Sequence, residues 1–85
     1  MKTENIEIIQ INISGEDKPG LTSSLTGILA CHDAFILDIG QSNIHRTMTL
    51  GILFMTTTER SGQIMKELLF KASEMNMTIR FEPIT

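Results

Sequence analysis

The stretch IEIIQINISGEDKPGLTSSLTGIL, residues 6–29, changes its hydrophobic period halfway along its length. The isoleucines of residues 9–13 alternate with polar residues, which predicts a β-strand over Ile6–Ser14 with one buried face. From residue 21 the apolar residues recur at i, i+4, i+7 and i+8, which predicts an amphipathic helix from about Gly20 to His32. A strand that leads into a helix is the first half of a β-α unit, and GEDKPG, residues 15–20, is its connection.

The next two apolar runs, FILDIGQSNI (residues 35–44) and TMTLGILFMT (residues 47–56), predict an antiparallel hairpin, because only the dipeptide His-Arg separates them. A register symmetric about this dipeptide gives three pairs in the middle of the hairpin: Gly40 with Gly51, Ile39 with Ile52 and Leu37 with Phe54. The face with the last two pairs is the better candidate for the core, since the other face has smaller side chains.

The rest of the chain predicts a helix from about Ser61 to Met75 and a last strand that begins near Met77 and ends before Pro83. The order β-α-β-β-α-β within one domain, residues 1–85, is the ferredoxin-like pattern of the α+β class: a four-stranded antiparallel sheet with two helices on one face. Right-handed crossovers place the second and fourth strands at the edges. The opposite face of the sheet lacks a helix, so we expect a homo-oligomer or an adjacent domain of the same chain to cover it.

Charge and cysteine content argue against several classes of function. The 85 residues carry a net charge of -3 without a cluster of Lys or Arg, which disfavours nucleic acid and anionic membranes as partners. Cys31 is the only cysteine, so the sequence has neither an internal disulfide nor a CxxC metal or redox motif. The sequence shows no signal peptide or membrane-spanning run, and we expect a cytoplasmic protein without a metal, a cofactor or catalytic residues.

The GEDKPG connection contains residue types that complement an amino acid. Pro19 suits the first helical position, and Gly20 leaves the first amides of the helix open, so the positive end of the helix dipole favours a carboxylate there. Asp17 could accept hydrogen bonds from an ammonium group. The two features together complement an amino-acid zwitterion. The alternative is that Asp17 only caps the helix or forms an Asx turn, as Asp before a helix usually does.

The segments SGEDKPGLTSSLTGILA, ILDIG and LGILF together resemble the ACT domain, a small-molecule-binding regulatory module with the β-α-β-β-α-β fold. The resemblance is closest to the N-terminal ACT region of bacterial phosphoserine phosphatases, and SGQIMKELLFKA extends it over nearly the whole chain. It implies a regulatory site for a small amino acid such as serine. The residues that match the ligand loop of the family are Asp17, Lys18, Pro19, Gly20 and Leu21.

The resemblance also implies that the chain is the N-terminal regulatory part of a longer protein. Phosphatases of this type have an aspartyl nucleophile in a DxDxT motif; neither Asp33 nor Asp38 has that context, so we expect no enzyme activity from these residues alone. Gly40, in ILDIG, offers clearance for a ligand or for a neighbouring backbone. Many amino-acid-binding members place an Asn near the start of the second strand, where this chain has Phe35. The alternative function is a ligand-free module for dimerisation or for packing against another domain.

Overall fold

A computed structural model describes residues 5–84, so residues 1–4 and 85 of the expected domain lie outside the described part of the chain. The elements follow the order β1 (Ile6–Glu16), α1 (Leu21–Cys31), β2 (Phe35–Ile44), β3 (Thr47–Thr57), α2 (Thr58–Glu74) and β4 (Thr78–Pro83). This order confirms the predicted α+β, ferredoxin-like fold.

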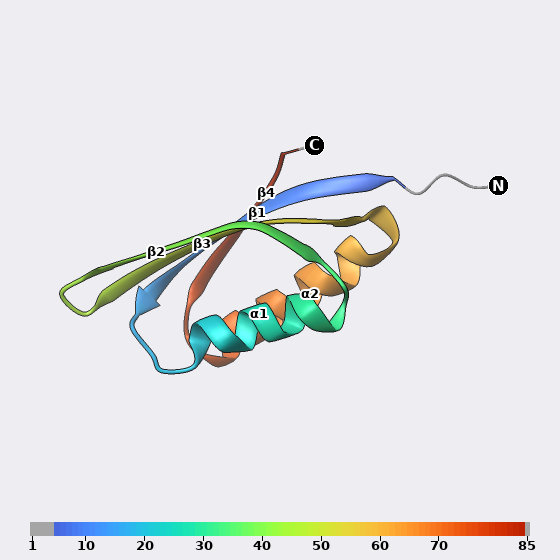
Figure 1. Ribbon diagram of the computed structural model, residues 1–85. Helices are drawn as coiled ribbons and strands as arrows, with labels where there is room; N and C mark the ends of the chain where they lie inside the picture. The colour runs from blue at the N-terminus through green and yellow to red at the C-terminus, as the bar shows by residue number, and fades with distance from the viewer. Residues whose placement is uncertain (1–4, 85) are drawn as a thin grey trace.

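The four strands form one antiparallel sheet in the order β2-β3-β1-β4, with both helices on the same face (Figure 1). The central strands are therefore β1 and β3, and the edges are β2 and β4, as the crossover rule predicts. The tip of the β2–β3 hairpin extends beyond the first turn of α1 (Figure 1). The amide of Asp17 donates to the carbonyl of Arg46 at 3.0 Å, so this tip and the β1–α1 connection lie side by side.

The core lies between the two helices and one face of the central strands. Alternate residues of β1 and β3 are buried, and they pack against apolar residues that recur one turn apart on α1 and α2. The fully buried side chains include Ile9, Ile11, Ile13, Leu21, Leu25, Leu29, Leu50, Ile52, Phe54, Ile64 and Leu68. The residues between them on the strands point to the other side of the sheet, which neither helix covers (Figure 1). We call this side the open face.

The edge strand β2 departs from the predicted register at Leu37. The pairs Gly40–Gly51 and Ile39–Ile52 are as predicted, but Phe54 lies opposite Ile36 because the register shifts by one residue after Ile36. Such a β-bulge adds one residue to one strand, and the alternation of residue types does not reveal it. Leu37 and Ile39 were expected in the core; they remain 43% and 44% exposed because an edge strand lies at the margin of the helix layer.

Helix α2 begins at Thr58, three residues before the predicted start at Ser61. The residues of TTTERSG are mostly poor helix formers, which is why the sequence favours a break there. In the structure Thr57 is the N-cap in an extended conformation, and Glu59 in the first turn lies at the positive end of the helix dipole. The helix therefore begins inside the segment that propensity alone predicts as a break.

Candidate ligand-binding site

The β1–α1 connection, the first turns of α1 and the outer part of β2 enclose a shallow pocket of about 480 Å³. It opens beside the hairpin tip. Its lining residues are Asp17, Lys18, Pro19, Gly20, Leu21, Thr22, Ser23, Thr26, Gln41 and Met48. The structure thus brings together the five loop residues that the sequence singles out, and adds polar groups from α1 and β2.

The start of α1 lies at the floor of this pocket and has no side-chain cap. Gly20 is the N-cap residue, with φ 82° and ψ -1°, and the helix begins at Leu21. This left-handed conformation is accessible to glycine without the steric penalty of a Cβ atom. The prediction that Pro19 occupies the first helical position is therefore wrong, because the left-handed Gly20 intervenes between Pro19 and the helix. The Leu21 amide donates to the Lys18 carbonyl at 3.5 Å, but no side chain caps the helix, so the amides of Thr22 and Ser23 can donate to a ligand.

Asp17 does not cap the helix; its side chain turns toward the hairpin. The carboxylate oxygen Oδ2 accepts a hydrogen bond from Nδ2 of Asn43 at 2.8 Å. Together with the bond from the Asp17 amide to the Arg46 carbonyl, this contact ties the loop to the hairpin. The second oxygen, Oδ1, has no hydrogen bond within residues 5–84 and is available to accept from an ammonium group.

A chain of side-chain hydrogen bonds continues from Asp17 around the pocket. Asn43 accepts at Oδ1 from Nε2 of Gln41 at 2.9 Å, and Gln41 accepts at Oε1 from the hydroxyl of Thr22 at 3.2 Å. The chain therefore joins the loop, β2 and α1. Sequence reasoning missed Gln41 and Asn43. A signal was present, because the predicted hairpin register puts residue 41 on the helix-covered side, where a polar residue next to a loop is unusual.

Lys18 is held by the other helix. Its ammonium nitrogen donates to the carbonyl of Met75 at 2.7 Å, and Met75 is the C-cap residue of α2. A cation at this position interacts favourably with the negative end of the helix dipole and satisfies one terminal carbonyl. The charge of Lys18 therefore fastens the loop to α2, and its contribution to the pocket is to position the neighbouring residues.

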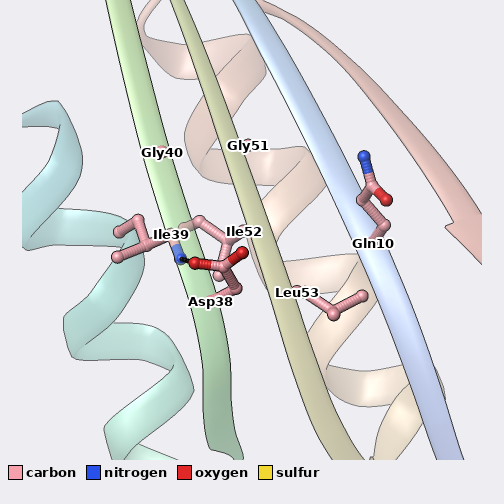
Figure 2. A pocket seen from close by; sticks show the side chains of 7 residues that line it. All are labelled: Gln10, Asp38, Ile39, Gly40, Gly51, Ile52 and Leu53. Carbon is pink, nitrogen blue, oxygen red and sulfur yellow. Dashed lines mark hydrogen bonds between the residues drawn. The ribbon is translucent and has the colours of Figure 1, made fainter.

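Gly40 lies away from the other five predicted residues, on the open face. It lines a depression of about 250 Å³ with Gly51 opposite it and with Asp38, Leu53 and Gln10 across three strands (Figure 2). An added Cβ at Gly40 would have nothing within 4 Å. The depression beside Gly40 and the loop pocket therefore lie on opposite faces of the sheet.

Phe35, at the start of β2, is also remote from the loop pocket. Its side chain is 62% exposed, and its register partner on β3 is Met55. The strand alternation puts it on the open face, toward the end of the sheet opposite the hairpin tip. The amide side chain on β2 that bonds to the loop is that of Asn43, while Gln41 bonds to Thr22 of α1.

Two further properties of the described residues bear on function. Within residues 5–84, no three or more His, Cys, Asp and Glu side chains gather around a common point as they would around a metal ion. None of the helices in this part of the chain is long and apolar enough to cross a membrane.

Comparison with known proteins gives one family and a set of similar folds. A sequence model described as the ACT domain matches residues 7–82. No curated protein matches the sequence. Similar solved structures include an unknown protein from Galdieria sulphuraria (TM-score 0.89, 14% identity), a protein assigned as a glycine cleavage system transcriptional repressor (TM-score 0.88, 14% identity) and an ACT domain protein from Streptococcus pneumoniae (TM-score 0.76, 21% identity).

The three structures differ in how much of their own length is matched. The similarity covers 100% of this chain and 53% of the Galdieria protein, 94% of this chain and 47% of the repressor, and 93% of this chain and 91% of the Streptococcus protein. This chain therefore spans about half the length of the first two. At these identities the likeness is one of fold.

Proposed function

The chain belongs to the ACT domain family, whose members are regulatory ligand-binding domains that typically bind amino acids, and from this premise we propose that it binds a small amino acid in the pocket at the β1–α1 connection. The observation that carries the proposal is the pairing of two complementary groups in that pocket. The uncapped start of α1 offers amide donors for a carboxylate, and Asp17 offers a carboxylate oxygen for an ammonium group.

The remaining lining of the pocket supports a ligand with a small, polar side chain. Hydroxyl groups of Thr22, Ser23 and Thr26 and the amide of Gln41 surround the space beside the helix start. The hydroxyl protons of Thr22, Ser23 and Thr26 are donated within the protein, so their oxygens can accept a hydrogen bond from a hydroxyl on the ligand. We therefore propose serine or a close relative as the ligand. The resemblance of DKPGL and the later segments to the ACT region of phosphoserine phosphatases supports the same choice.

The proposed mechanism is linkage. A ligand that binds one arrangement of the domain more tightly than another stabilises that arrangement, and an attached enzyme would follow the shift. We propose a phosphoserine phosphatase domain as that enzyme. Sequencing the gene beyond codon 85 tests this point: a DxDxT motif is expected downstream, and a different downstream domain would contradict it.

A ligand-free packing module is the second candidate function. The observation that favours it is that one oxygen of Asp17 is already bonded to Asn43, while the open face carries exposed apolar residues that need a cover. In this case the loop would only fix the hairpin against the helices.

Thermal unfolding with a panel of amino acids separates the two functions. Serine, glycine and alanine at millimolar concentration are compared with their amides, which lack the carboxylate. A ligand at one hundred times its Kd stabilises the folded state by about 2.7 kcal/mol, which raises the unfolding midpoint by several degrees in a domain of this size.

Two variants serve as the matched pair for this assay. Asp17→Asn removes the proposed ammonium acceptor and should abolish the ligand-induced rise in midpoint. Asp33→Asn removes an exposed carboxylate that contacts Arg60 outside the pocket and should leave the rise intact. The binding function is contradicted if no amino acid raises the midpoint, or if Asp17→Asn responds as the unmodified protein does.

A further inference from the structure

A row of hydroxyl groups crosses the open face between the middle of the sheet and the hairpin tip. Each strand contributes one residue to it, and successive residues are register partners: Ser42, Thr49, Ser14 and Thr78. Their strand neighbours Ile13 and Leu50 are fully buried on the helix-covered face, so the hydroxyl groups point to the open face. The row therefore contributes nothing to the core and remains available to a ligand.

Three residues of this row line a shallow pocket of about 330 Å³ together with Arg80. The complete lining is Asn12, Ile13, Ser14, Thr49, Thr78 and Arg80, and we call this space the hydroxyl pocket. Arg80 follows Thr78 by two residues on β4, so the two side chains lie on the same face. The pocket therefore has hydroxyl groups on three neighbouring strands and a guanidinium group at the β4 edge.

The donors of the hydroxyl pocket are free to bind a ligand. Within residues 5–84, no hydrogen bond or ion pair involves the side chain of Arg80 or the three hydroxyl groups. Glu82, two residues further along β4, instead accepts from Nδ2 of Asn12 at 3.4 Å. The N–H donors of one guanidinium group and the protons of three hydroxyl groups are therefore available.

Donors of this kind select an oxyanion with more than two oxygens. A guanidinium group donates two parallel hydrogen bonds to a carboxylate or a phosphate, and these two bonds already occupy both oxygens of a carboxylate. A phosphate group has further oxygens for the hydroxyl protons. Hydroxyl groups on neighbouring strands follow the strand spacing of about 4.8 Å, and one tetrahedral group between two of them lies within hydrogen-bond distance of both.

We propose that the hydroxyl pocket binds a phosphate group. Arg80 donates to two of its oxygens, and the hydroxyl groups of Ser14, Thr49 and Thr78 donate to the others. The phosphate is either the free ion or part of a small ester, since the donors recognise only the phosphate itself. The hydroxyl pocket lies on the face of the sheet opposite the loop pocket, so this proposal does not rest on amino-acid binding.

The charges around the hydroxyl pocket set the expected strength of binding. Arg80 is its only cation, Glu82 lies two residues away on the same face, and the whole chain carries a net charge of -3. We therefore expect a Kd of about 1 to 10 mM for inorganic phosphate, which should increase with ionic strength. Glu82→Gln removes the repulsion and should lower this Kd by about twofold to threefold.

A titration with inorganic phosphate, followed through the amide NMR signals and without an amino acid present, tests the site. Sodium chloride at matched ionic strength is the reference. Phosphate should shift the signals of residues 14, 49, 78 and 80, and chloride should not. Arg80→Gln should raise the Kd by about tenfold or more. The matched control is Arg46→Gln, which removes the same charge from the hairpin turn and should leave the Kd unchanged.

A second pair of variants tests the hydroxyl groups. Thr49→Val should raise the phosphate Kd severalfold, whereas Thr47→Val, on the same strand and outside the pocket, should not. The amide spectra also show that each variant is folded. Glycerol phosphate in a parallel titration separates the two sources, because an ester that binds more tightly than the free ion indicates a phosphorylated metabolite. Equal shifts with phosphate and chloride, an Arg80→Gln Kd equal to that of Arg46→Gln, or weaker binding by Glu82→Gln would each overturn the proposal.

Discussion

Ile52 and Leu53 are neighbours on β3, yet Ile52 is fully buried on the helix-covered face while Leu53 is only half-buried on the open face. The same contrast separates Ile9 from Ile8 on β1. Both phases of these strands carry isoleucine or leucine, so hydrophobicity alone does not select the buried phase. The helices select it, since their apolar stripes can cover only one side of the sheet. Apolar residues on the other side remain available for association.

The largest expected loss of stability comes from truncating a side chain on the helix-covered face of β3, and it can be compared with the same change on the open face. Ile52→Ala should lower the free energy of unfolding by about 2 to 5 kcal/mol, because a fully buried side chain leaves a cavity that its neighbours fill only in part. Leu53→Ala should cost about 0.5 kcal/mol in the dilute monomer, since its side chain is already partly in water. Urea denaturation at submicromolar concentration measures both. Similar losses for the two variants would contradict the assignment of the faces.

A smaller effect tests how the helix layer is fastened to the rest of the domain. Lys18→Met removes the hydrogen bond from the ammonium group to the Met75 carbonyl at the end of α2, which should cost about 1 kcal/mol. Lys66→Met changes an exposed lysine of the same helix and serves as the control, with an expected change within about 0.5 kcal/mol. Equal denaturation midpoints for the two variants would mean that the bond adds nothing to stability.

The smallest effect concerns the contact between the two helices. Gln63 donates to Glu67 Oε2 at 2.8 Å, and His32 Nε2 lies 3.0 Å from Glu67 Oε1. Both hydrogen bonds lower the pKa of Glu67 below its usual value of 4.5, and the bond from Gln63 has the larger effect. A carboxyl whose pKa is lower in the folded state stabilises that state above the unfolded-state pKa, and this contribution is lost as the pH falls through the folded-state pKa.

The variant Glu67→Gln should therefore be less stable than the unmodified protein at neutral pH, and the gap should close as the pH falls below about 4.5. Denaturation midpoints between pH 3 and pH 7 measure the gap. Glu16→Gln, at an exposed carboxylate at the end of β1, controls for the general loss of a carboxylate. A difference in denaturation midpoint that stays constant with pH would show that the ionised carboxylate of Glu67 is not its cause.

The element order and the strand order could be predicted from the sequence, because they follow from hydrophobic period and from the handedness of crossovers. Ile9, Ile11 and Ile13 alternate with Gln10 and Asn12, so the middle of β1 indicates its buried phase, whereas Ile6 and Ile8 lie on the other phase and do not. The bulge at Leu37 could not be predicted, since one additional residue in an edge strand leaves no mark in an apolar run.

The candidate site was predictable where it depends on local chain chemistry and not where it depends on contacts between elements. The loop residues from Asp17 to Leu21 do line one pocket, but the role of Pro19 was wrong, because a left-handed Gly20 breaks the continuity of the turn. Asn43 bonds to Asp17 in the loop, 26 residues earlier, and Gln41 bonds to Thr22 in α1, 19 residues earlier. These hydrogen bonds depend on where the β2–β3 hairpin lies relative to the β1–α1 loop. The spacing of residues within the loop carries no information about that position.

Gly40 lies in the middle of β2, although the packing of the domain leaves room for a larger residue there. A glycine in the middle of a strand costs about 0.5 to 1 kcal/mol relative to alanine. An added methyl group at this position would have nothing within 4 Å, so the packing of the domain itself does not require glycine. In a library randomised at position 40, selection for folding alone should therefore drift toward alanine and β-branched residues, so a glycine that persists there under selection for function would report a requirement outside the packing of the domain.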